Sequence, residues 1–291
     1  MVAAAVLGLA GVIAGAAGIA TPTPERSAPV AGSVGDRPQA SEPAPPRGTP
    51  TATTGAVPSA TDSIPTPAPT PTAPADPTPP PTPPRVSLDV DIVTDHKAVF
   101  AHEIRTTWCA SAGVQITLAI LGLGDTSAAF QREIQGRVGR WDSYADSHNG
   151  RWGPTAMARA LDAYGAKGYE VRTYKTRQGA LRGAAKAIEA TGAPVILLAW
   201  RGAHTWVMTG FRADADPAVF ADATIHGAYV LDPWYPSVSS IWGRSDPPGT
   251  FQNNAEMVRN YLPWKRPEGK YPGRDGLFIT VIPTIAIAPA N

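Results

Sequence analysis

Residues 193–200 read APVILLAW, and residues 204–212 read HTWVMTGFR. The first run is apolar throughout, which is typical of a central strand that is buried on both faces. The second run begins four residues later and is predicted as the next strand. Two more strands are predicted at 227–233 and 276–283, so that the C-terminal part of the chain forms a sheet.

Helical patterns come before this sheet. The predicted helices run from Cys109 to about residue 122, from the capping residues 125–127 onward, from Pro154 to Gly165, and over 177–190. The second has apolar residues at helical spacing, and the third has proline in the first turn, where its missing N–H does no harm. A short first strand is predicted within 86–93. Helices followed by strands indicate an α+β fold, with N-terminal helices packed on a mostly antiparallel sheet.

The N-terminal third of the chain differs from the rest in composition. Residues 1–20 carry no charge and are predicted to be a signal peptide or a membrane anchor. Residues 21–85 form a Pro/Thr/Ala-rich linker that is expected to be disordered, because 20 of the chain's 32 prolines and no aromatic residue lie in 21–84. All tryptophans, tyrosines and phenylalanines lie in the remainder, so residues 86–291 are predicted to form one globular domain that is secreted or tethered outside the cell.

The charge distribution argues against several kinds of partner. Residues 1–85 carry a net charge of −1 and the remainder +2, with no basic stripe among the aromatic residues. Nucleic acid is therefore not an expected partner. We find no phosphate-binding glycine loop and no His/Cys metal-ligand cluster, so no cofactor is expected. The expected state is a monomer that meets the membrane only through its N-terminal segment, with a protein or peptide substrate and the cell wall as candidate partners.

Cys109 is the chain's single cysteine. Exported proteins normally use cysteines in pairs, because their surroundings oxidise them into disulfides. A lone thiol is therefore incidental, intermolecular or a nucleophile. Its predicted place at a helix N-terminus favours the thiolate, and the neighbouring Trp108 is large enough to shield an ion pair from water.

His204 and Asp232 are predicted to meet at one edge of the sheet. If the strands 204–212 and 227–233 pair antiparallel about residue 218, position 204 falls opposite position 232. A carboxylate beside an imidazole fixes its tautomer and stabilises its cation. The order Cys109, His204, Asp232 is the pattern of nucleophilic acyl transfer.

These residues stand in motifs that resemble a known family. Trp108-Cys109-Ala110 at a helix start, GAHTWVMTG at 202–210 and Leu231-Asp232-Pro233-Trp234 are similar to papain-like cysteine peptidases. Within these, the chain resembles the branch of the bacteriocin-leader (double-glycine) peptidases, family C thirty-nine, and it shares motifs with staphopain-type secreted peptidases. The resemblance covers roughly 104–236. It implies a papain-like fold, with Cys109 as nucleophile, His204 as general base and acid, and Asp232 as the orienting residue.

The chain departs from this family at Glu103. The family places a glutamine there, six residues before the cysteine, whose amide helps to stabilise the oxyanion. A carboxylate cannot donate a hydrogen bond unless it is protonated. Either Glu103 is held neutral while the Cys109 N–H and another donor serve, or the fold is kept with weakened activity.

Aromatic residues provide the candidate substrate contacts. Trp206 lies in the histidine motif, and Trp234 follows Asp232 within a Trp/Tyr-rich segment. Both are predicted to bind substrate. The alternative is that the Trp/Tyr-rich segment, Trp234 included, only packs a long irregular excursion before the last strand.

Three functions fit the sequence. The leading hypothesis is an exported thiol peptidase with a Cys-His-Asp triad. The second is a cell-wall amidase or endopeptidase of the NlpC type, which uses the same Cys-His chemistry but usually has Asp-Cys-Ser around the nucleophile. The third is a catalytically silent surface-binding domain on a stalk.

Overall fold

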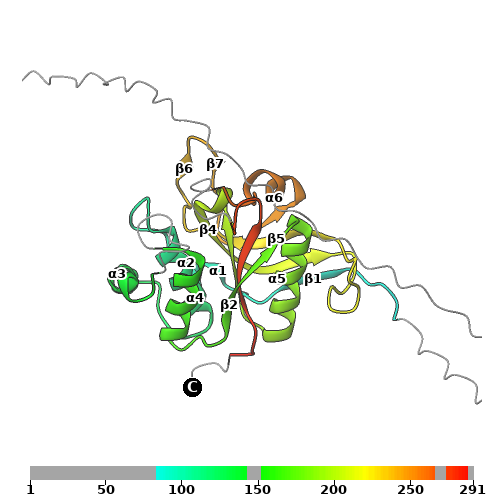
Figure 1. Ribbon diagram of the computed structural model, residues 1–291, viewed down its shortest axis with the longest axis horizontal. Coiled ribbons are helices and arrows are strands. Elements are labelled where there is room, and N and C mark those ends of the chain that lie inside the picture. The colour runs from blue at the N-terminus through cyan, green and yellow to red at the C-terminus, as the bar shows by residue number, and fades with distance from the viewer. Residues whose placement is uncertain (1–82, 143–151, 266–272, 288–291) are drawn as a thin grey trace, which may run out of the picture. The chain divides into compact units, whose positions relative to one another are not determined.

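A computed structural model describes residues 83–142, 152–265 and 273–287 (Figure 1). The predicted N-terminal segment 1–20 and nearly all of the predicted linker 21–85 lie outside the described residues. Within the described residues, no helix is long and apolar enough to cross a membrane. The same residues contain no group of three His, Cys, Asp or Glu side chains that could hold a metal ion.

The main sheet has seven strands in the described part of the chain, and all of its pairings are antiparallel. The strand order is β2-β9-β3-β4-β5-β8, with β1 also paired to β4. These strands are β1 (Leu88–Asp91), β2 (Tyr169–Tyr174), β3 (Val195–Ala199), β4 (His204–Ala213), β5 (Ile225–Leu231), β8 (Thr250–Asn253) and β9 (Phe278–Pro283). The short strands β6 (Val238–Ser239) and β7 (Gly243–Arg244) pair separately.

The helices cover both faces of this sheet. They are α1 (His96–Val99), α2 (Cys109–Ile120), α3 (Ala128–Arg137), α4 (Pro154–Ala163), α5 (Arg177–Thr191) and α6 (Asn254–Asn260), with 3-10 turns at Val138–Arg140 and Trp200–Gly202. Figure 1 shows α2, α3 and α4 grouped on one side and α5 on the other. The predicted α+β class with a mostly antiparallel sheet is confirmed.

Each face of the sheet has its own hydrophobic core. Alternate residues of β3 point to opposite faces, as strand geometry requires. Ile196 and Leu198 pack with α2 and α4, whereas Val195 and Leu197 pack with α5. The continuous apolar run of β3 is therefore explained by burial on both faces, as the sequence predicted.

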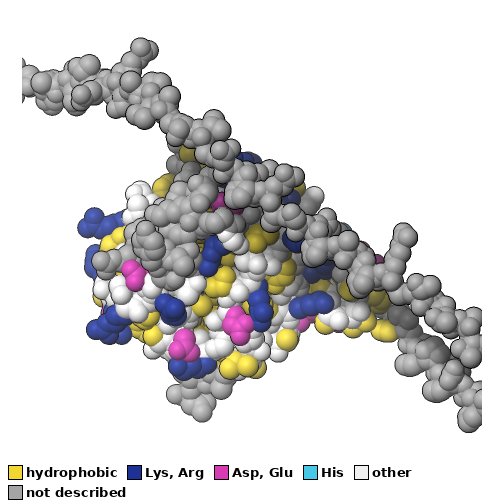
Figure 2. Space-filling model, viewed as in Figure 1, with side chains coloured by type: hydrophobic (Ala, Val, Ile, Leu, Met, Phe, Trp, Pro, Cys, Tyr) yellow, Lys and Arg dark blue, Asp and Glu magenta, His cyan; other side chains and the backbone are white. Residues whose placement is uncertain are grey.

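The sequence missed several elements of the sheet and its surroundings. The edge strand β2 reads YEVRTY, with charged residues on its exposed side, so it carries no strong apolar signal. The segment predicted to be an irregular excursion contains β6, β7, β8 and α6. On the face shown in Figure 2, Lys/Arg and Asp/Glu side chains are interspersed, in agreement with the small net charge.

Candidate active site

Cys109 is the first residue of α2, and its side chain is 8% exposed. Trp108 is the N-cap residue of α2, and its side chain accepts no hydrogen bond from the first backbone N–H groups of the helix. These N–H groups belong to the same helix turn as the Cys109 sulfur. The N-terminal end of a helix favours a negatively charged group. The local structure therefore suits a thiolate.

The helix that carries Cys109 lies directly on the strand that carries His204. Gly113 is one turn after Cys109 and faces Thr205 of β4, where an added Cβ would overlap the threonine methyl group. Only glycine allows this close approach of helix and strand. The small residues of α2 thus set the separation between the sulfur and the sheet.

His204 and Asp232 form a buried pair. His204 begins β4, Asp232 directly follows β5, and the imidazole Nε2 lies 2.6 Å from the carboxylate Oδ1. The same oxygen accepts a hydrogen bond of 2.9 Å from the Trp234 backbone N–H. Because Asp232 engages Nε2, the second ring nitrogen, Nδ1, is left for another partner.

At the end of β4 nearer His204, the register of β4 and β5 differs from the prediction by two residues. Val207 lies opposite Leu231, whereas pairing about residue 218 would place it opposite Tyr229. The register also shifts within the pair, between Met208 and Gly210. A two-residue displacement keeps every side chain on the same face of the sheet. His204 therefore still reaches Asp232, although the two are diagonal rather than directly opposite.

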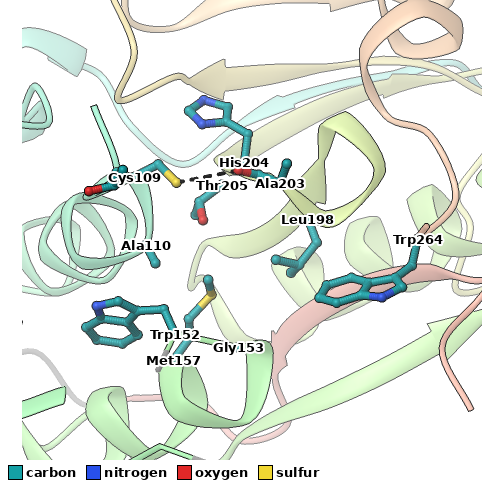
Figure 3. Close-up of a pocket in the computed structure, with 12 residues that line it drawn as sticks. Cys109, Ala110, Trp152, Gly153, Met157, Leu198, Ala203, His204, Thr205 and Trp264 are labelled. Carbon is teal, nitrogen blue, oxygen red and sulfur yellow. Dashed lines mark hydrogen bonds between the residues drawn. The ribbon is translucent and has the colours of Figure 1, made fainter. Parts of the chain in front are cut away.

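Cys109 and His204 line the same small cavity (Figure 3). The Cys109 sulfur lies 4.0 Å from the carbonyl oxygen of Ala203, the residue before the histidine. The cavity has a volume of about 20 Å³, enough for about one water molecule, and its lining includes the apolar side chains of Met157, Leu198 and Trp264. The structure thus places Cys109 and His204 at one cavity, with Asp232 in contact with His204 outside its lining.

The electrostatics of the site favour a charged imidazole. Burial lowers the pKa of His204, but the charge and hydrogen bond of Asp232, together with the Cys109 thiol group, raise that pKa above its ordinary value of 6.5. The net direction is upward, because the 2.6 Å contact with a carboxylate outweighs the loss of solvent.

Glu103 is 3% exposed, and neither of its carboxyl oxygens has a hydrogen-bond partner among the residues that the structure describes. Burial raises the pKa of Glu103 to about 7; the charge of His204 opposes this rise and that of Asp232 adds to it. A buried, unpartnered carboxyl group is costly when ionised. Glu103 is therefore neutral over the acidic range and charged above about pH 7.

Two glutamines hold the segment that carries Glu103. Gln131 of α3 donates to the His102 carbonyl at 3.0 Å and accepts from the Ile104 N–H at 2.8 Å. Its amide also donates to Gln115 of α2 at 2.8 Å. The Glu103 N–H donates to the Pro233 carbonyl at 3.0 Å, which ties this segment to the strand end at Asp232.

His102, the residue before Glu103, contacts two backbone carbonyl groups through its ring. Its Nδ1 lies 3.1 Å from the carbonyl oxygen of Pro233 and 2.8 Å from that of Tyr235. The ring therefore ties the segment before α2 to the residues after Asp232.

The predicted tryptophans occupy different positions around the site. Trp108 is half-buried, with the Arg105 guanidinium 5.5 Å from its ring centre. Trp206 is buried in the core on the α5 side and is not among the residues that line the cavity beside Cys109. Trp234 meets the His204 ring edge to face, with ring centres 6.4 Å apart. The structure thus places Trp234 at the histidine.

Sequence reasoning missed Trp200, which stacks on the His204 ring. A signal was present. Trp200 is the last residue of the apolar run 193–200 and directly follows β3. Only residues 200–203 connect β3 to His204. A turn this tight brings the residue after one strand back towards the first residue of the next.

Comparisons with known proteins give one distant structural likeness. No family model and no curated protein matches the sequence. The structure is similar to the crystal structure of a double glycine motif protease from an AMS/PCAT transporter in complex with the leader peptide. The two are 15% identical, with a TM-score of 0.32, over 64% of this chain and 91% of that one.

Proposed function

We propose that this chain is a cysteine-type peptidase in which Cys109, His204 and Asp232 form a catalytic triad. The observation that carries the proposal is that Cys109, at the start of a helix, lines one cavity with His204, while Asp232 lies 2.6 Å from the His204 ring. A nucleophile, a base and a group that orients the base are the parts that acyl transfer requires. The motifs that resemble papain-like peptidases point to the same residues.

The proposed reaction has two steps. The Cys109 thiolate attacks the peptide carbonyl carbon and forms a carbon–sulfur bond. As the tetrahedral intermediate collapses, His204 donates a proton to the leaving amine and the carbon–nitrogen bond breaks. Water then attacks the thioester while His204 takes up its proton, which releases the acid and regenerates the thiolate. Asp232 keeps the imidazole oriented in both steps.

Alkylation of Cys109 by iodoacetamide tests the triad without a known substrate. An isolated thiol becomes reactive only as the pH approaches about 8.5. We expect Cys109 to react well below pH 8, because a charged imidazole beside it stabilises the thiolate. His204→Ala is expected to move the alkylation profile up towards that of a free thiol. The rate is measured by mass spectrometry over pH 4–10, and the lone cysteine makes the site of labelling unambiguous.

His226→Ala is the matched control, since this histidine is exposed on β5 and has no contact with the cavity. We expect that variant to keep the wild-type profile. Should wild type and His204→Ala share a single profile centred near pH 8.5, the triad does not exist and a silent binding domain becomes the better reading.

We further propose that Glu103 acts as an uncharged hydrogen-bond donor to the oxyanion. Support comes from its two buried, unpartnered oxygens and from its pKa of about 7. Below that pH the carboxylic acid can donate, and above it the carboxylate cannot. The peptidase rate is therefore expected to fall as the pH rises through about 7.

Glu103→Gln supplies an amide donor at every pH. This variant is expected to keep its rate through pH 8, and Glu103→Ala to be slow throughout, as measured by kcat/KM on the best-cleaved member of a peptide library. If kcat/KM falls over the same alkaline pH range in wild type and in Glu103→Gln, the titrating group is not Glu103. If neither wild type nor Glu103→Gln cleaves any peptide of the library, the silent binding domain is favoured instead.

We also propose that the domain is exported and either released or tethered. Support comes from the uncharged segment 1–20 and the proline-rich linker 21–85. N-terminal sequencing of the protein from culture medium and from membranes checks this proposal. A start near residue 21 supports cleavage, a membrane-bound form with residue 1 intact supports an anchor, and recovery only from the cytosol contradicts both.

A further inference from the structure

The connection between β3 and β4 is strained immediately before His204. Ala199 and His204 are paired across the two strands, so residues 200–203 make the whole turn. Trp200, Arg201 and Gly202 have φ values of 51°, 61° and 86°. Left-handed backbone is open to glycine but costs other residues about 1–3 kcal/mol each. Two residues other than glycine therefore hold an unfavourable conformation next to the proposed base.

This turn folds the Trp200 indole onto the face of the His204 imidazole. The two ring centres are 3.9 Å apart and the ring planes differ by 19°. Both residues are buried, at 8% and 2% exposure. With Asp232 at the ring nitrogen Nε2 and the indole against the ring face, the imidazole is held in both its position and its plane.

The indole is itself fixed from two directions. Its Nε1 donates to the Asn260 side-chain oxygen of α6 at 3.2 Å. Trp242, which directly precedes β7, lies parallel to Trp200 within 6°, with ring centres 5.8 Å apart. A side chain held by a hydrogen bond and by a second aromatic ring can impose its orientation on a neighbour.

We propose that Trp200 is a positioning residue for His204, which fixes the plane of the imidazole between Asp232 and Cys109 and stabilises its positively charged form through the indole face. The inference deepens the proposed function and rests on it, because it needs His204 to alternate between neutral and charged states. A cation over an indole face is attracted by the ring's negative electrostatic potential, most strongly where water is excluded. Trp200 contacts neither substrate nor sulfur in this role.

The titratable groups that face the His204 ring come from three elements. Asp232 follows β5, Cys109 begins α2, and Glu103 lies in the segment before α2. Cys109 complicates a titration of His204, since the two groups exchange a proton. A Cys109→Ala background removes that coupling, so that the carboxyl groups and the indoles of Trp200 and Trp234 remain beside the ring.

The test is an NMR titration of His204 in the full-length Cys109→Ala protein with ¹³C-labelled histidine. The signal is assigned by its loss in His204→Gln. Trp200→Leu is expected to lower the pKa of His204 by about one unit, because the cation loses its aromatic face. Trp200→Phe keeps a smaller aromatic face and is expected to restore part of that shift.

Trp141→Leu is the matched control. Trp141 is a similarly buried tryptophan, at 6% exposure, but it packs against Trp152 and Tyr164 on the α4 side of the sheet. This variant loses comparable packing and is expected to leave the His204 titration unchanged. Circular dichroism and thermal unfolding report whether each variant is folded. A folded Trp200→Leu protein whose His204 titrates as in the parent overturns the proposal.

Fluorotryptophan provides a test that does not disturb packing. Incorporation of 5-fluorotryptophan weakens the negative face of every indole and is expected to lower the pKa of His204 by a few tenths of a unit. In Trp200→Phe protein, fluorination is expected to have a smaller effect, because only Trp234, which meets the His204 ring edge to face, remains beside that ring. An equal shift with and without Trp200, or no shift in either protein, contradicts the proposal. The titrated protein lacks the nucleophile, so these outcomes are independent of whether the wild-type chain cleaves peptides.

Discussion

Changing Cys109 to alanine is expected to lower kcat/KM for peptide hydrolysis by about four to six orders of magnitude. In the proposed reaction the sulfur forms the bond to the substrate, and members of a catalytic triad act as a unit, so removal of one abolishes nearly all of their joint effect. The side chain is small and nearly buried, so alanine fits without a clash. Digestion of casein and of a peptide library, followed by mass spectrometry, measures the loss.

Ser111→Ala is the matched control, because it alters the same turn of α2 without removing the sulfur. Ser111 donates a hydrogen bond of 2.9 Å to the Trp108 carbonyl, and its loss is expected to leave most of the activity. Purified peptidoglycan assayed in parallel distinguishes a peptidase from a cell-wall amidase. Equal turnover by wild type and Cys109→Ala would rule out thiol catalysis on either substrate.

Changing Asp232 to alanine is expected to reduce both stability and reactivity. The His204 Nε2 and the Trp234 N–H would lose their shared acceptor inside the protein. Removal of one partner of a buried pair typically costs about 3–5 kcal/mol of unfolding free energy. The imidazole also loses the charge that raises its pKa, so we expect peptide hydrolysis to fall by about two to four orders of magnitude.

Asp232→Asn separates the two effects. Asparagine keeps the volume and an acceptor oxygen, so we expect it to lose only about 1–2 kcal/mol of unfolding free energy. Its neutral amide supports the charged imidazole less well, and alkylation of Cys109 should need a higher pH than in wild type. Urea unfolding gives the first quantity and the alkylation profile the second. An Asp232→Ala protein as stable and as reactive as wild type would mean that the His204–Asp232 pair carries neither role.

The sequence predicted those parts of the fold whose burial is reflected in residue type. The run of β3 is apolar because both of its faces are covered, and α2 begins where Cys109 was expected to begin a helix. The strand β2 was missed because an edge strand needs no apolar pattern. The β4–β5 register was off by two residues near His204 and by three at Gly210–Arg212, because the register shifts within this strand pair leave no mark in residue type.

The contact between His204 and Asp232 was predictable from the sequence, but the surroundings of the candidate site were not. His204 and Asp232 could be paired from strand order alone, since a two-residue displacement leaves side chains on one face. The burial of Glu103 depends on Gln131 of α3, which holds the backbone on both sides of it, and such a contact cannot be read from spacing. Trp200 reaches His204 only through left-handed backbone, which residues other than glycine rarely adopt.

The spacing of the proposed triad depends on Gly113, a residue with no proposed role in the chemistry. Its single hydrogen atom lets the helix that bears the sulfur rest on the strand that bears the imidazole, against Thr205. A larger side chain at this position would push α2 away from β4. A variant with a larger residue at 113 would keep all three groups of the proposed triad. It would nevertheless hold Cys109 farther from His204, because helix α2 would be pushed away from strand β4.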